Sequence, residues 1–100
     1  MTEKVHLPDL TSTPHAVVFD ADPRVVRLRL GTGDELPAHR HPDERIVLHL
    51  LKGALELRLG ETTHSLTTGD VIRFDGDQDV SPHAVEDAEA LLVLTERATA

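Results

Sequence analysis

The stretch Pro37-Ala38-His39-Arg40-His41-Pro42 constrains the fold and the site of this 100-residue chain more than any other. Residues two positions apart in an extended strand point to the same face. We therefore expect the imidazoles of His39 and His41 on one side of a strand and Arg40 on the other. Neutral imidazoles are common ligands of transition metals, so two that converge from one strand form half of a metal site. The pattern predicts metal chemistry inside a β-barrel.

The rest of the sequence alternates short apolar runs with turn residues, which predicts an all-β sandwich or barrel. Gly60-Glu61 suits a two-residue hairpin turn between two of these runs. The alanine content of residues 85–94 leaves a helix open as the alternative for that segment. The expected strands cover residues 15–19, 25–30, the histidine stretch up to 42–43, 46–51, 55–59, 62–67, 71–74, and 83–85 with 90–94.

Alternation within these runs predicts which side chains face the interior. Val26, Leu28 and Leu30 share one face. The arginines on the opposite faces of their strands are expected on a solvated or intersubunit surface: Arg27, Arg29, Arg58 and Arg73. Residues 46–51 form a nearly continuous apolar run, which is typical of a strand buried on both faces or lying at a subunit contact. His49 then points outward, opposite to Ile46.

The remaining histidines lie in edge or terminal segments, where we expect ordinary surface residues: His6, His15 and His64.

Length and composition predict one domain over residues 1–100, with a core at about 15–96 and the loosest parts at 1–12 and 97–100. The net charge of −8 disfavours binding to nucleic acid or to an anionic membrane. Residues 1–20 lack the long apolar core of a signal peptide or anchor, so the expected compartment is the cytoplasm.

Two residue types limit the chemistry of any interior site. The sequence contains no cysteine, which excludes disulfides, thiolate ligands and thiol nucleophiles. It contains two phenylalanines but no tryptophan or tyrosine, so an interior pocket is expected to have aliphatic walls.

The order of these features resembles the cupin superfamily of small double-stranded β-helix, or jelly-roll, barrels. The first motif of that family places a His-x-His pair and a glutamate between two glycines. Gly33, the two histidines and Gly53 fall in register with it, while Ile46 occupies the glutamate position.

The second cupin motif is degenerate in this chain. It begins well at Gly69, but Asp75 and Asp77 replace its proline and its second glycine. His83 comes three residues later than the motif allows, and Asp87 stands where the family has asparagine. The resemblance extends over roughly residues 25–94.

The resemblance implies that His39, His41 and His83 bind a divalent transition metal such as Zn, Fe, Mn, Ni or Cu. Without the glutamate, an iron site of two histidines and one carboxylate needs another acid. Glu44, two residues before Ile46, is the candidate for that carboxylate ligand. The alternative is that Glu44 is a solvated acidic residue of the turn.

Two functions follow from this reading. The first is a metal-dependent cupin, either a dioxygenase or an isomerase, that acts on a small organic acid. The alternative is a non-catalytic barrel that binds or senses a small molecule and has lost the metal-site glutamate. We also expect a homodimer whose interface includes part of residues 46–51 or the N-terminal segment.

Overall fold

The computed structural model describes residues 2–20 and 22–96 and contains only strands and one short 3-10 helix in those ranges. Residues 97–100, expected to be loose, lie outside the described part. Within it, no helix has the length and hydropathy that crossing a membrane requires. The elements are η1 (Leu7–Asp9), β1 (His15–Phe19), β2 (Arg24–Leu30), β3 (Glu44–Lys52), β4 (Ala54–Leu59), β5 (Thr62–Thr67), β6 (Val71–Asp75), β7 (Val80–Ala84) and β8 (Ala88–Glu96).

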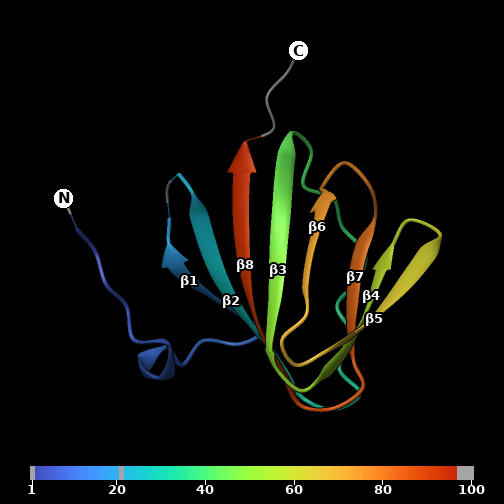
Figure 1. Cartoon of the computed structure of the whole chain (residues 1–100), viewed down its shortest axis with the longest axis horizontal. Coiled ribbons are helices and arrows are strands. Elements are labelled where there is room, and N and C mark those ends of the chain that lie inside the picture. Colours follow the sequence, from blue (N-terminus) through green and yellow to red (C-terminus); the bar gives the residue numbers. More distant parts are fainter. Residues whose placement is uncertain (1, 21, 97–100) are drawn as a thin grey trace.

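The strands form two antiparallel sheets that face each other as a double-stranded β-helix. The larger sheet has the order β1-β2-β8-β3-β6, and the smaller has the order β5-β4-β7. Figure 1 shows β8 between β2 and β3, although β8 is the last strand in the chain. Contacts between distant parts of the sequence therefore define both sheets. The all-β jelly-roll prediction is confirmed, and the helix alternative for residues 85–94 is wrong because β8 occupies most of that segment.

The prediction of a strand over the histidine stretch is wrong. The backbone of residues 35–41 pairs with β7 through isolated bridges rather than a continuous ladder. His39 N–H donates to the Val80 carbonyl at 3.2 Å, and Val80 N–H donates to the His39 carbonyl at 3.0 Å. Pro37 and Pro42 lack an N–H group, so they cannot continue a regular ladder on either side of this bridge. The stretch nevertheless lies along the edge of the smaller sheet.

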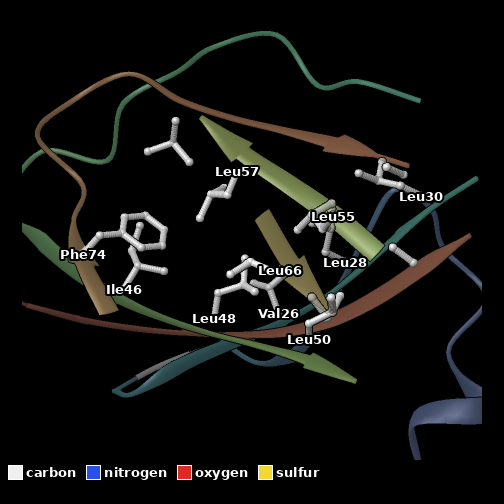
Figure 2. Packing of buried hydrophobic residues seen from close by; sticks show 14 of the residues in the cluster. Val26, Leu28, Leu30, Ile46, Leu48, Leu50, Leu55, Leu57, Leu66 and Phe74 are labelled. Atoms are coloured by element: carbon white, nitrogen blue, oxygen red, sulfur yellow. The ribbon is translucent and has the colours of Figure 1, made fainter. Parts of the chain in front are cut away.

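Alternating leucines, valines and isoleucines from both sheets form the core, as the sequence predicts. Figure 2 shows Leu55 and Leu57 of β4 facing Val26 and Leu48 of the larger sheet. Leu50 has an exposed fraction of 0%. Complete burial of an aliphatic side chain of this size stabilises a fold by about 1.5–3 kcal/mol.

Gly53 fixes the turn between β3 and β4 against the loop between β7 and β8. Its φ of +91° is a conformation that residues with a Cβ rarely adopt. A Cβ on Gly53 would also lie 2.0 Å from the Asp87 carbonyl oxygen. The turn glycine of the first motif is thus required by a close backbone approach as well as by its φ angle.

The outer face of the larger sheet departs from the sequence prediction at Arg27. This side chain was expected on a solvated or intersubunit face, but its exposed fraction is 0%. Its Nη2 donates to the carbonyls of Leu10 and Ser12, both at 3.1 Å, and Nη1 lies 3.6 Å from Glu89 Oε2. The prediction of a solvated side chain fails because the N-terminal segment lies over this part of the sheet.

Candidate functional site

The space between the sheets is hollow at one end of the barrel, where a cavity of about 300 Å³ lies. This volume is at the lower end of the ~300–1,000 Å³ range of small-molecule sites. Most of its lining is apolar, and the predicted aliphatic walls are present: Val17, Val26, Leu28, Leu36, Ile46, Leu48, Leu57, Val80, Pro82, Leu92 and Leu94, to which Phe74 adds an aromatic ring. Figure 2 shows Phe74 beside Ile46 within this lining. The polar lining residues are His15, Arg24, His39 and His41.

His39 and His41, hereafter the histidine pair, both line the cavity. Their ring centroids are 4.6 Å apart and the ring planes meet at 72°. His39 Nδ1 lies 3.1 Å from the Pro37 carbonyl oxygen. Because a carbonyl can only accept, Nδ1–H is the donor in this contact. The two rings therefore share one side of the segment, as their spacing predicts, although the segment is not a regular strand.

A tight turn directly after the pair sets the position of His41. Pro42 and Asp43 are its central residues, Asp43 has a φ of 66°, and Glu44 N–H donates to the His41 carbonyl at 3.2 Å. Gly76 holds this turn from outside: its carbonyl accepts from His41 N–H at 2.7 Å, and its N–H donates to Glu44 O at 2.9 Å. A Cβ on Gly76 would lie 2.4 Å from His41 O. Only glycine allows this approach without displacing the ring-bearing segment.

His83 does not join the histidine pair. It is half-buried on β7, and its Nδ1 lies 3.9 Å from Glu56 Oε2 on the neighbouring strand. The buried side chains of β7 are Val80, Pro82 and Ala84. His83 therefore points to the opposite, outward face. His83 lies three residues after the histidine position of the second motif. Because side chains alternate between the two faces of a strand, a shift by an odd number of residues puts the side chain on the opposite face.

The predicted three-histidine metal set does not fit this arrangement. Among residues 2–20 and 22–96, no group of three or more histidines and carboxylates is placed to hold a metal ion. Glu44, the candidate carboxylate ligand, lines a separate groove beside the cavity rather than the cavity itself. The structure therefore brings together two of the predicted ligands, His39 and His41.

Two cavity residues were not recognised in the sequence. His15 is exposed on the edge strand β1, as the sequence predicts, and from there it also lines the cavity beside Val17. Arg24 lines it from the first position of β2. Strand alternation contained a signal for both: His15 shares a face with Val17, and Arg24 shares one with Val26.

Burial and the neighbouring positive charges favour the neutral forms of His15 and His41. Burial, followed by the neighbouring His39, lowers the pKa of His41, and the nearby Glu44 opposes this shift. Burial, His39 and Arg24 lower the pKa of His15. Around neutral pH these imidazoles are hydrogen-bonding groups without charge, and Arg24 is the cation of the cavity lining.

Comparison with protein families matches residues 26–95 to the cupin domain. The chain belongs to the cupin family. The resemblance read from the histidine and glycine pattern is thereby confirmed, while the family as a whole hosts many activities. A comparison with curated proteins finds no match.

Solved structures with the same fold are distant in sequence. The cupin domain of Schizosaccharomyces pombe Cnp3 aligns with a TM-score of 0.84 at 16% identity, covering 93% of this chain and 73% of that one. An uncharacterized conserved protein with a double-stranded β-helix domain from Klebsiella pneumoniae has a TM-score of 0.83 at 17% identity, covering 100% and 95%. KdgF from Halomonas sp. has a TM-score of 0.73 at 19% identity, covering 84% and 78%. At these identities the likeness establishes the fold alone.

The lowered pKa of His41 predicts how stability depends on pH. The ordinary histidine pKa is 6.5 and the folded value lies below it, so the unfolded chain binds the proton more readily. The titration of His41 makes no contribution to stability well above pH 6.5, and it destabilises the fold as the pH falls below that value. We predict that His41→Gln loses less stability on acidification than the wild type does, measured as the urea unfolding free energy above and below pH 6.5. His64→Gln, on an exposed position of β5, is the matched control. Identical pH dependence of the His41→Gln protein and the wild type would contradict the prediction.

Proposed function

We propose that this cupin domain binds a small aliphatic molecule in the hollow end of its barrel. The observation that supports this most is the cavity of about 300 Å³ between the two sheets, with aliphatic walls and four polar residues. An apolar cavity with a few convergent polar groups is the usual architecture of a small-molecule site. The function is binding or sensing of a ligand whose polar group contacts the histidine pair.

The lining also limits the class of ligand. The deep walls contain no hydroxyl, amide or carboxylate side chain, so the hydroxyl groups of a sugar would lose hydrogen bonds to water without replacement. No tryptophan or tyrosine is present to stack against a sugar or a base. A cavity of about 300 Å³ has room for about ten groups the size of a water molecule. An unbranched chain of the length of octanol matches that space.

We predict that the protein binds octanol saturably, measured by titration calorimetry and by amide NMR shifts at cavity residues. Leu92→Trp places a larger side chain in the cavity and should weaken octanol binding at least about tenfold. Val85→Trp is the matched control, because this exposed valine of the loop between β7 and β8 lies outside the cavity lining. Val17→Trp fills the cavity from its half-exposed rim and serves if Leu92→Trp does not fold. Equal octanol affinity in the wild type and both cavity-filling variants would refute the proposed site.

The second candidate is metal-dependent chemistry on a small organic acid, by a dioxygenase or an isomerase. The observation that favours it is the 4.6 Å separation of the two imidazole rings, which gives two ligands for a divalent ion such as Zn, Fe, Mn, Ni or Cu. Its weakness is the third ligand, because His83 faces outward and Glu44 lines the neighbouring groove.

Ile46 provides the test of this second candidate. It lines the cavity together with the histidine pair, at the position where the first motif has glutamate. If the pair binds a divalent ion, Ile46→Glu adds a carboxylate and should raise Zn²⁺ affinity about tenfold or more, measured by calorimetry. His83→Ala should leave the affinity unchanged, whereas His41→Ala should remove it. Equal Zn²⁺ binding by the wild type, Ile46→Glu and His41→Ala would reject the pair as ligands.

We also propose a homodimer that buries the outer face of the larger sheet. This face has half-buried apolar side chains on its central strands, Val47, Leu51, Leu91 and Val93. Val71, on the edge strand β6, has an exposed fraction of 61%. The protein should scatter light with twice the 11.0 kDa mass of one chain, and Val71→Asp should shift it toward the monomer. Val85→Asp, at an exposed valine of the loop between β7 and β8, is the control. A wild-type mass of a single chain at micromolar concentration would rule the dimer out.

A further inference from the structure

We infer that Arg24 anchors an anionic head group, so that the ligand of this cavity is an aliphatic carboxylate. The inference rests on the proposed binding function and adds the chemical class of the ligand. In this arrangement the hydrocarbon tail occupies the aliphatic cavity, and the carboxylate lies at its rim beside Arg24.

The position of Arg24 at the rim is fixed by the sheet. It is the first residue of β2 and pairs in register with Leu94 of β8. Arg24 shares the inward parity of Val26 and Leu28, which lie deeper in the same cavity. It also lines the neighbouring groove, so its side chain lies at the boundary between the cavity and the solvent.

The guanidinium of Arg24 is not committed to another residue. Within residues 2–20 and 22–96, other arginines make ion pairs: Arg27 and Arg29 with Glu89, Arg40 with Asp79, and Arg45 with Asp75. No side-chain hydrogen bond or ion pair joins Arg24 to any residue in those ranges. A guanidinium has five N–H donors in a planar fork, which matches the two oxygens of a carboxylate.

The charged and polar groups around Arg24 favour an anion on one side of its guanidinium. Carboxylates line the groove on its solvent side: Asp22, Asp43, Glu44 and Glu96. On the cavity side its polar neighbours are the imidazoles of His15, His39 and His41. The carboxylates repel an anion in the groove, whereas an imidazole N–H of His15 or His41 can donate a hydrogen bond to a carboxylate oxygen. The favourable place for the anionic group is therefore the cavity side of the guanidinium.

Three probes with similar hydrocarbon tails test this inference by calorimetry: octanoate, octanol and octylamine. The wild type should bind octanoate about fivefold to tenfold more tightly than octanol, with octylamine weakest. Arg24→Gln should remove the preference for octanoate and leave octanol binding unchanged. Arg73→Gln, at an exposed position of β6 outside the cavity, changes the net charge equally and should keep the preference. The preference should also shrink as salt is added.

The possible outcomes distinguish the role of Arg24 from the binding of a ligand in the cavity. Octanol binding with no preference for octanoate, or the same preference in Arg24→Gln as in the wild type, overturns the role of Arg24 and leaves the proposed function standing. Tightest binding of octylamine also overturns the anionic class. Failure of both octanol and octanoate to bind overturns the proposed function itself.

Discussion

Strand parity is the constraint on which the interior of this domain depends. In each strand, one set of alternate side chains faces the opposite sheet and the other set faces outward. This rule places Leu48 and Leu50 in the core and His49 outside it. The same rule places Arg24 at the rim of the cavity and turns His83 toward Glu56. A change of one position in register would exchange the two sets, so the site depends on the pairing of β2, β3 and β8 as much as on its own residues.

The packing of the barrel divides its interior into a closed end and a hollow end. At the closed end, buried side chains such as Leu30, Leu50 and Leu55 fill the space and do not line the cavity. At the hollow end, the segment that bears the histidine pair lies along the edge of β7 and leaves room between the sheets. Gly76 permits the close approach that holds this segment in place. The closed end supplies stability, and the hollow end contains the cavity proposed as the binding site.

The family explains the fold and only part of the site. Residues 26–95 match the cupin domain, and the first motif supplies the histidine pair and the turn glycine Gly53. Ile46 in place of the motif glutamate and the outward His83 leave two imidazoles where the resemblance implied a complete ligand set. Because the same barrel serves many chemistries, the function of this chain depends on the residues of the cavity and its rim.

The sequence by itself determined the fold class, most strand positions and the inward leucines, because alternation is a local property that can be read along the chain. It also determined that His39 and His41 lie together, since they are two residues apart. Only the tertiary structure decided that the N-terminal segment buries Arg27 and that His83 stays outside the cavity. Each of these depends on how segments distant in sequence meet, through strand order, register and loop length, and no local pattern contains that information.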